Sequence, residues 1–327
     1  MSYSFFGTCF NDQYYFFDCL KSILNQTILP KEIILVNSGD VNIEQEIINL
    51  INPERVKLIY IKSNLSRVKA LNVALDKSTA DYSFRFDTRS RFARDYAENA
   101  LKILGDKNLK TTVVGGVPLA ICNSNKFESN ICAEIINSNY LFFFPKHRNS
   151  NYSGYASSIY LGCFVTNTLK NIRFNEKESL LSEDSLIIND FLENGFKAYI
   201  SSSIKLEYLC RESFLNILKL FNTYGFCRIN TILVSKKLFI SKRHFFVFLV
   251  LMTLLIILAK LSISLTLFFP VILLIFNFYN EFTFYRKRSN LFVPIYGTLC
   301  QFSWILGFLW GLISSFKDEQ NKSNFIS

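Results

Sequence analysis

Hydrophobic residues in the first quarter of the chain form short runs that alternate with stretches of helical spacing. The runs of strand length are Tyr3–Phe10, Glu32–Val36, Val56–Ile61 and Tyr82–Phe86. Between them, apolar positions recur at helical spacing in residues 16–24, 43–51 and 67–75. Strands that alternate with helices of this length predict an α/β fold with a mixed, mostly parallel sheet and helices on both of its faces.

The last quarter of the chain shows a different pattern, with long apolar tracts. Residues 245–278 contain a single charge, Lys260, and residues 291–316 contain none. A membrane helix needs about 20 predominantly apolar residues. We therefore expect a membrane region over residues 236–327, with three transmembrane helices near residues 245–260, 262–280 and 291–314. A buried helical hairpin in a soluble domain is the alternative for the first tract, but Trp304 and Trp310 in the second favour a membrane.

Basic residues flank the first two expected spans. They are Lys236, Lys237, Lys242 and Arg243 on one side and Arg286, Lys287 and Arg288 on the other. Because positive residues stay on the cytoplasmic side, we expect residues 1–235 to lie in the cytoplasm. The apolar run Phe5–Phe17 is interrupted by polar residues and lacks a basic leader, which predicts that no signal peptide is present.

Composition agrees with a membrane-associated intracellular protein. Hydrophobic residues make up 50% of the 327 residues, more than in an ordinary soluble enzyme, and the net charge is +10. The basic flanks account for part of this charge and suit anionic lipids. Nucleic acid is not an expected partner, because no basic module or aromatic RNA-binding motif accompanies the charge. The eight cysteines form no C-x-x-C pair, and with two histidines they argue against disulfides or a zinc site.

One carboxylate ends the aromatic run 82–86. Asp87 is followed by Thr88 and Arg89. In an open α/β sheet the ligand crevice lies beyond the carboxyl ends of the strands, so an acid at this position can face a substrate. The alternative is that Asp87 caps the helix expected after Phe92.

Three ordered segments resemble a known family. Leu20–Val36 resembles the opening of family 2 glycosyltransferases of the GT-A fold, which commonly read S-L-x-x-Q-T-x-P-x-E-I-I-V-V-D. Asn64–Asn72 resembles their N-x-G-x-x-x-A-R-N run, with Ser66 and Leu71 as departures. Asp87 then falls where the family has its D-x-D strand end.

The resemblance continues beyond this half and covers about residues 3–230. Val113–Pro118 and Asp87–Ser90 are similar to the V-G-G and D-A-H-S segments of the subgroup that builds bacterial exopolysaccharides such as succinoglycan. Glu183 and Asp184 stand at the family's E-D pair. The segments similar to the subgroup's P-R-x-S-L and Y-G-R-W-K are Arg211–Phe214 and Tyr224–Arg228.

This resemblance implies a domain organisation and an activity. Residues 1–235 are expected to form a GT-A domain, with a nucleotide-sugar half over 1–118 and an acceptor half over 119–235 that ends in an interfacial helix. The implied enzyme is an inverting, multi-pass protein of the bacterial inner membrane. It moves one sugar from a UDP-linked donor to a polyprenyl-diphosphate-linked glycan for O-antigen, capsule or exopolysaccharide.

The family's E-D pair suggests the catalytic base. One carboxylate near the acceptor hydroxyl suffices to remove its proton, and we expect this to be Asp184, with Glu183 beside it. The structural alternative is that both acids open the helix 186–192, with Ser182 as its cap. The expected contacts to the acceptor or to lipid headgroups are Arg211, Tyr224 and Arg228.

Donor recognition departs from the family pattern. Asn37 and Ser38 replace the acids that bind the base, and an asparagine can still pair with a pyrimidine edge. Arg67 and Asn72 are expected near the phosphate or the sugar, although Arg67 could be an exposed helix residue. The full expected donor set is Thr8, Asn11, Asn37, Ser38, Arg67, Asn72, Asp87 and Arg89.

Arg89 stands where a second acid commonly holds the metal, and a guanidinium cannot ligate one. Either Asp87 binds the cation together with waters and phosphate oxygens, or Arg89 itself meets the charge of the pyrophosphate. We expect Asp87 to be the metal ligand and a divalent cation, Mn2+ or Mg2+, to be required.

Two other functions remain open. A processive polysaccharide synthase is one, although the Q-x-x-R-W signature is absent and three spans are few for a channel. A catalytically inactive scaffold that binds a nucleotide sugar is the other, suggested by Asn37, Ser38 and Arg89 in place of acids. The segment 126–158 has no clean period, so its aromatic residues fit an acceptor-side loop or a packed helix equally well.

Overall fold

The structure, a computed structural model, describes residues 1–142, 146–176, 182–235, 268–285 and 290–323, and the single residues 256 and 260. The chain divides into two compact units. The first comprises residues 1–121, 146–179 and 183–210, and the second comprises 122–145, 180–182 and 211–327. The domain boundaries expected from the sequence, at residues 118 and 235, stay a prediction.

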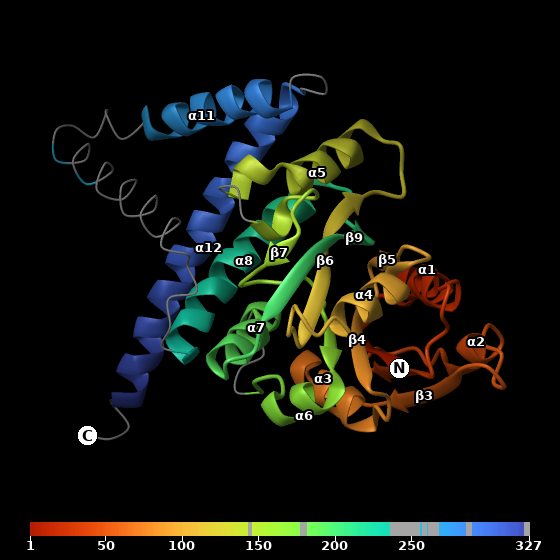
Figure 1. Cartoon of the computed structure of the whole chain (residues 1–327). Helices are drawn as coiled ribbons and strands as arrows, with labels where there is room; N and C mark the ends of the chain where they lie inside the picture. The colour runs from red at the N-terminus through yellow and green to blue at the C-terminus, as the bar shows by residue number, and fades with distance from the viewer. Residues whose placement is uncertain are drawn as a thin grey trace. The chain divides into compact units, whose positions relative to one another are not determined.

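The first unit contains the α/β elements (Figure 1). Its strands are β1 (Tyr3–Cys9), β2 (Glu32–Asn37), β3 (Lys57–Lys62), β4 (Tyr82–Asp87), β5 (Ser90–Phe92), β6 (Val113–Ile121), β7 (Gly154–Tyr155), β8 (Cys163–Val165) and β9 (Ala198–Leu209). Its helices are α1 (Gln13–Leu24), α2 (Glu44–Ile48), α3 (Arg67–Lys77), α4 (Tyr96–Leu104), α6 (Thr166–Ile172) and α7 (Glu183–Glu193), with a 3-10 turn at Lys146–Arg148. The elements expected over residues 3–86 are all present.

All of these strands join one mixed sheet in the order β3-β2-β1-β4-β8-β6-β9-β5, with β7 paired to β9. The strands β1 to β4 are parallel to one another. Strand β8 is antiparallel to β4 and β6, whereas β9 is parallel to β6. The prediction of a mixed, mostly parallel sheet is confirmed, and the carboxyl ends of β1, β2 and β4 meet at one edge.

Side chains of successive strand residues enter two different cores, as the pleat requires. Phe5 packs with the buried residues of α1, α2 and α4, while its neighbour Phe6 packs with those of α3, α6 and α7. The expected helices on both faces are therefore present. Phe84 and Phe86 belong to the first core, so Arg85 between them points to the second face, which α7 covers.

The V-G-G segment lies at an irregular point of the sheet. The ladder between β6 and β9 shifts register between Gly115 and Val117. A Cβ atom on Gly116 would lie 1.8 Å from the backbone oxygen of Ile204, and one on Gly115 would lie 2.3 Å from a methyl group of Ile159. Gly116 therefore allows a close approach of two backbones, and Gly115 leaves room for the side chain of Ile159.

The second unit is helical. Its elements are α5 (Phe127–Asn137), a 3-10 turn at Asn139–Phe142, α8 (Phe214–Ser235), α11 (Phe268–Phe284) and α12 (Phe292–Ser323). Among the described residues, one helical stretch, Phe292–Ser315, has the length and composition of a membrane span. It coincides with the third expected span. Helix α11 covers part of the second expected span, and the first lies outside the described residues apart from residues 256 and 260.

Helices α8 and α12 run side by side and approach to backbone contact (Figure 1). A Cβ atom on Gly225 of α8 would lie 2.0 Å from the carbonyl oxygen of Trp304, and one on Gly307 of α12 would lie 2.0 Å from that of Asn222. A Cβ atom on Gly311, one turn further, would lie 2.1 Å from a methyl group of Ile229. We call these three glycines the glycine seam. Small residues four positions apart, as in Gly307 and Gly311, are typical of tightly packed membrane helices.

Candidate functional site

Three of the expected donor residues meet at the edge where the parallel strands end. Thr8 of β1 pairs with Asp87 of β4, and Cys9 pairs with Asn37 of β2. The register of the strands thus brings together side chains that are far apart in the chain. This edge is where an α/β sheet can present polar groups to a ligand without exposing its core.

Asp87 is held by an arginine of helix α3. Its Oδ2 atom accepts a hydrogen bond from Nη2 of Arg67 at 2.9 Å, and the side chains are 25% and 51% exposed. Burial raises the pKa of Asp87, but Arg67 and Arg85 outweigh it and hold the pKa below its usual value. Asp87 is therefore ionised at neutral pH.

The expected catalytic pair lies in the first turn of α7 and joins the same network. Oε1 of Glu183 is 3.0 Å from Nε of Arg67 and 2.9 Å from Nη2 of Arg85. Asp184 forms an ion pair with Nη1 of Arg85. Acids and arginines therefore alternate without a break, and we call this set the charge chain. In order, it is Asp87, Arg67, Glu183, Arg85 and Asp184.

Arg85 was missed by the sequence reasoning. Its side chain is 1% exposed, and its guanidinium carbon lies 5.5 Å from the centre of the Phe174 ring. A buried guanidinium needs charged partners, and the acids of α7 supply them. The signal in the sequence was a single charge inside an otherwise apolar strand, between Phe84 and Phe86.

Their surroundings shift the pKa values of the two acids of the pair in opposite directions. Burial raises the pKa of Glu183, but Arg67 and Arg85 outweigh it and lower the pKa. Burial raises the pKa of Asp184 to about 6, against the opposing effect of Arg85 and with the help of Glu183. Glu183 thus keeps its charge, while Asp184 can exchange a proton near neutral pH, which a general base requires.

Arg89 turns away from Asp87 toward helix α1. Its Nη2 atom is 3.1 Å from Oδ1 of Asp12, and its guanidinium lies 3.8 Å from the centre of the Tyr15 ring. The cation that contacts Asp87 is thus Arg67. A direct role of Arg89 at the pyrophosphate stays a prediction.

The amides of Asn37 and Asn11 stabilise the turn after β2. Nδ2 of Asn37 donates to the carbonyl oxygen of Val41 at 2.8 Å and to the hydroxyl of Tyr60 at 2.7 Å. Oδ1 of Asn37 accepts from the backbone of Gly39, and Asn11 and Asp40 exchange two hydrogen bonds. Next to them, the backbone N–H of Ser38 donates to the carbonyl oxygen of Cys9 at 2.9 Å. A nucleotide base that binds Asn37 would have to share or replace one of its bonds.

Asn72 is buried and connects α3 to the chain after α6. Its Nδ2 atom donates to the carbonyl oxygen of Phe174 at 2.9 Å and to Oε1 of Glu176 at 2.6 Å. Its Oδ1 atom accepts from the backbone N–H of Phe174 at 3.0 Å. These contacts position the segment that leads toward α7, so they contribute to the site indirectly. Donor contact by Asn72 stays a prediction.

The charges of the site indicate which ligands it can bind. Among the described residues, no three histidine, cysteine or acidic side chains converge on one point. The charge chain has three carboxylates and two guanidiniums, which leaves one negative charge in excess. A pyrophosphate would add further negative charge, so a divalent cation that arrives with the phosphates fits Asp87. A cation that is bound by protein ligands alone does not fit this site.

The other expected residues belong to the second unit. Arg211 precedes α8, and Tyr224 and Arg228 lie on α8. Tyr224 is 40% exposed, with its ring 6.3 Å from that of Phe221. Contact of these residues with an acceptor or with lipid stays a prediction.

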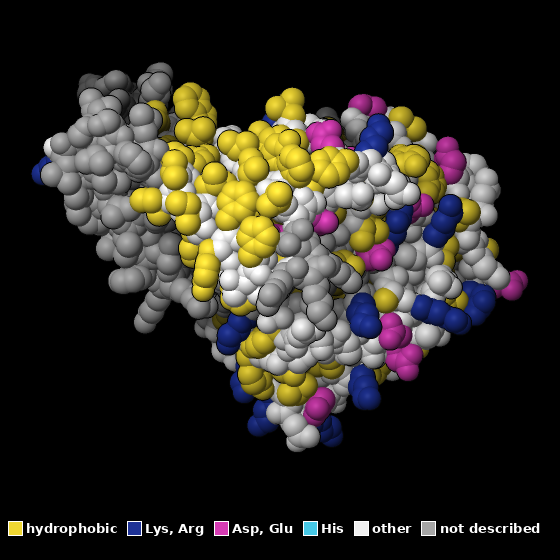
Figure 2. Space-filling view, turned by 90° about the horizontal axis from the view of Figure 1, so that it is seen from above, with side chains coloured by type: hydrophobic (Ala, Val, Ile, Leu, Met, Phe, Trp, Pro, Cys, Tyr) yellow, Lys and Arg dark blue, Asp and Glu magenta, His cyan; other side chains and the backbone are white. Residues whose placement is uncertain are grey.

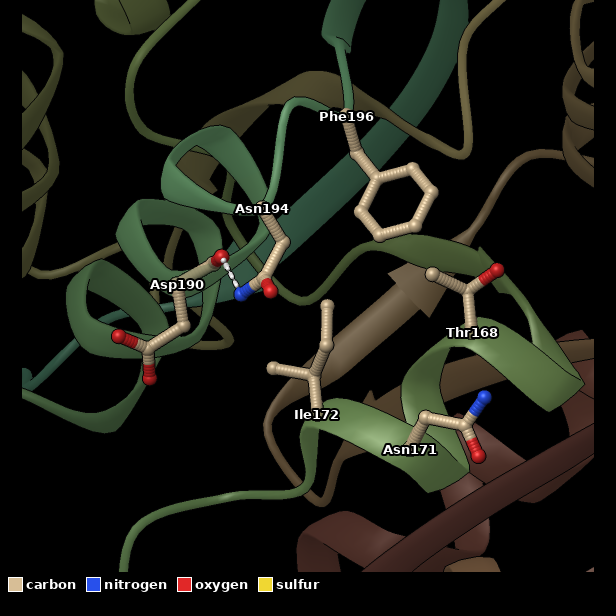
Figure 3. Close-up of a pocket in the computed structure, with 6 residues that line it drawn as sticks. All are labelled: Thr168, Asn171, Ile172, Asp190, Asn194 and Phe196. Carbon is tan, nitrogen blue, oxygen red and sulfur yellow. Dashed lines mark hydrogen bonds between the residues drawn. The ribbon is translucent and has the colours of Figure 1, made fainter.

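A surface hollow of about 470 Å³ lies at α6, α7 and the turn that follows α7 (Figure 3). It is lined by Thr168, Asn171, Ile172, Asp190, Asn194 and Phe196. It contains none of the expected site residues and no buried charged group, so we do not assign the function to it. The charge chain is the better candidate because it joins charged side chains of three separate elements, α3, β4 and α7.

Comparisons with known proteins assign the part of the chain that contains most of the charge chain to a known family. Residues 4–166 match the family model of Glycosyl transferase family 2. These residues are a family 2 glycosyltransferase domain. The matched part of the glycosyltransferase domain contains Arg67, Arg85 and Asp87, and it ends before Glu183. A curated relative, an uncharacterized glycosyltransferase of Haemophilus influenzae, is 31% identical over 105 residues, which span 32% of this chain and 42% of the relative.

Solved structures share the fold. The mannosyltransferase PcManGT of Pyrobaculum calidifontis, in complex with GDP-Man and Mn2+, has a TM-score of 0.57 and 15% identity over 94% of this chain and 87% of its own. The S. aureus TarS fragment 1-349, in complex with UDP-GlcNAc, has a TM-score of 0.50 and 14% identity over 93% and 90%. The GT-A fold expected from the resemblance is thereby confirmed.

Proposed function

We propose that this chain is a membrane-anchored, inverting glycosyltransferase of the bacterial inner membrane. It moves one sugar from a nucleotide-sugar donor to a polyprenyl-diphosphate-linked glycan in the synthesis of a surface polysaccharide. The observation that carries the proposal is the charge chain. It joins Asp87, at the strand ends where a donor binds, to Asp184, the acid of the charge chain whose pKa is raised toward neutrality.

The charge chain supports a different role for each of its three acids in the reaction. Asp184 removes the proton of the acceptor hydroxyl while that oxygen attacks the anomeric carbon, and the nucleotide leaves from the opposite face. Glu183 stays ionised and, with Arg85, keeps Asp184 in place. Asp87 would hold the divalent cation, Mn2+ or Mg2+, which neutralises charge on the leaving phosphates. The Mn2+ in the PcManGT complex supports this assignment.

The nucleotide of the donor is proposed to be UDP. Among the solved relatives, the TarS fragment is described with UDP-GlcNAc and PcManGT with GDP-Man, so the fold accepts both kinds of base. Asn37 at the end of β2 lies where the base is expected, and its amide suits a pyrimidine edge. The V-G-G and D-T-R-S segments favour the exopolysaccharide subgroup and hence a polyprenyl-linked acceptor.

Membrane anchoring is proposed from the surface of the second unit. Large hydrophobic side chains gather on one part of the molecule (Figure 2). Leu306, Trp310 and Ile313 of α12 are 62%, 60% and 50% exposed, and their spacing places them on one face of the helix. Ile275 and Tyr279 of α11 are 63% and 68% exposed. Apolar faces of this extent on two helices suit lipid better than water.

A direct assay tests the proposal. Protein purified in detergent is incubated with a panel of nucleotide sugars and a lipid-linked acceptor extract, with and without Mn2+. We expect transfer of a single sugar from one donor, with loss of transfer in excess chelator. Addition of many sugars would favour a processive synthase, and donor binding without hydrolysis or transfer from any donor would favour an inactive scaffold.

A further inference from the structure

Arg67 differs from the other arginine of the charge chain in its exposure to solvent. The side chain of Arg85 is 1% exposed and packs over Phe174, whereas that of Arg67 is 51% exposed. Arg67 is also the first residue of α3, so its side chain extends from the end of the helix. The more exposed arginine of the charge chain is thus also the one that contacts Asp87.

The contacts of Arg67 occupy one oxygen of each of two acids that could bind a cation. Its Nη2 atom lies 2.9 Å from Oδ2 of Asp87, and its Nε atom lies 3.0 Å from Oε1 of Glu183. Two carboxylates from β4 and α7 therefore converge on one guanidinium. A divalent ion and this guanidinium cannot bind the same oxygens at the same time, because like charges repel at close range.

The position of Arg67 is a departure from the family pattern. The N-x-G-x-x-x-A-R-N run has its arginine where this chain has Leu71, which is 1% exposed. Arg67 lies four residues earlier, one turn toward the start of α3, and residues four apart share a helix face. Helix α3 therefore keeps a positive charge, but this charge lies at the start of the helix, next to the end of β4.

We propose that Arg67 is a resident counter-ion of the unliganded donor site. Without donor it bridges Asp87 and Glu183 and keeps the two acids from repelling each other. When a donor enters with its cation, Arg67 turns to the phosphates and leaves Asp87 to the cation. The proposal rests on the proposed function, and it makes Arg67 a donor-binding residue that also sets the order of binding, with little cation bound before the nucleotide.

Binding of Mn2+ alone provides the test, because it does not depend on sugar transfer. Mn2+ is titrated into the full-length protein in detergent and the free ion is measured by electron paramagnetic resonance. We expect Arg67→Met to bind Mn2+ at least about tenfold more tightly than the wild type, since the competing guanidinium is gone. Lys69→Met is the matched control, because Lys69 is exposed on the same helix, and it should match the wild type.

Binding of UDP completes the test. In the presence of Mn2+, we expect Arg67→Met to bind UDP more weakly than the wild type by calorimetry, because the arginine no longer reaches the phosphates. Arg67→Lys should lie between the two, since an ammonium cannot bridge two carboxylates as a guanidinium does. The double variant with Asp87→Asn should lose the gain in Mn2+ affinity.

Two results would overturn the proposal. One is Mn2+ affinity in Arg67→Met and Arg67→Lys equal to that of Lys69→Met, and the other is UDP affinity unchanged in both Arg67 variants. Thermal melting of each variant shows whether it is folded, and Arg67→Lys keeps the test open if the methionine variant is not. A gain in Mn2+ binding without sugar transfer by any variant supports the role of Arg67 and contradicts the proposed enzyme.

Discussion

The charge chain of the first unit and the glycine seam of the second are built in opposite ways. In the charge chain, large charged side chains from α3, β4 and α7 converge, and each acid is held by an arginine. In the glycine seam, side chains are missing: the backbones of α8 and α12 touch at Gly225 and Gly307, and Gly311 leaves room for the side chain of Ile229. The first region should therefore be sensitive to changes of charge at constant volume, and the second to changes of volume at constant charge.

The largest effect is expected when one charge of the chain is removed at constant shape. Asp184→Asn should lower kcat for sugar transfer by about 10²–10⁴-fold, the usual contribution of a general base. Binding of the donor should be unchanged, because Asp184 contacts Arg85 and not the strand ends. Transfer is measured with a labelled donor and binding by calorimetry.

A control for this variant lies on the same helix. Glu193, at the end of α7, accepts a hydrogen bond from Asn189 at 2.9 Å and lies outside the charge chain. Glu193→Gln should transfer sugar at the wild-type rate. If Asp184→Asn keeps near-normal turnover, Asp184 is only a partner for buried Arg85.

The matching change in the glycine seam adds volume without charge. Gly307→Leu should reduce the free energy of unfolding by about 1–3 kcal/mol, because its Cβ atom would lie 2.0 Å from the carbonyl oxygen of Asn222. Its thermal melting in detergent is compared with that of Leu306→Ala, a change at the neighbouring exposed position. Equal melting temperatures for the two variants would show that α8 and α12 are not packed through the seam.

Acidification probes the charge chain and should leave the glycine seam unaffected. A general base acts in its ionised form, and the pKa of Asp184 is raised to about 6. Activity should therefore be full above this pH and fall as the pH drops through it, by about tenfold per unit in kcat/KM. Glu183, whose pKa is lowered, should not contribute in this range. An acid limb near pH 4 would mean that Asp184 is not perturbed as the structure indicates.

The smallest effect is expected at Arg89, a charged residue near the site that lies outside the charge chain. Arg89→Met removes the contacts with Asp12 and Tyr15 and should cost about 1 kcal/mol of stability. Its effect on UDP binding should be smaller than that of Arg67→Met, because Arg67 is the cation at Asp87. If Arg89→Met weakens UDP binding more, Arg89 contacts the phosphates as the sequence had suggested.

Much of the first unit was predictable because its signals are local. The alternation of apolar runs with helical spacing identified β1 to β4 and the helices between them, and the polar residues after β4 marked Asp87 as a strand-end acid. Glu183 and Asp184 were found through their resemblance to a family motif. The charge chain itself was not predicted, because Arg85 and Glu183 are 98 positions apart and meet only when α7 packs on the sheet.

The glycine seam shows the same limit in the second unit. The apolar tract of α12, which contains Gly307 and Gly311, was visible in the sequence. The helix that packs against these glycines was not, because residues 236–291 separate α8 from α12 and α8 carries a single glycine, Gly225. Which helix fills the space left by a missing side chain depends on packing, and packing has no signature along the chain.

The sequence by itself determined which segments become strands and helices, since the period of the hydrophobic pattern decides which face of each segment is buried. It also placed an acid at the end of β4 and two acids at the start of α7. Only the tertiary structure decided which arginine neutralises each acid, and thus which carboxylate keeps its charge and which can take a proton. The reason is that burial and Coulomb interactions depend on distances in space, and these arise only when α3, β4 and α7 come together.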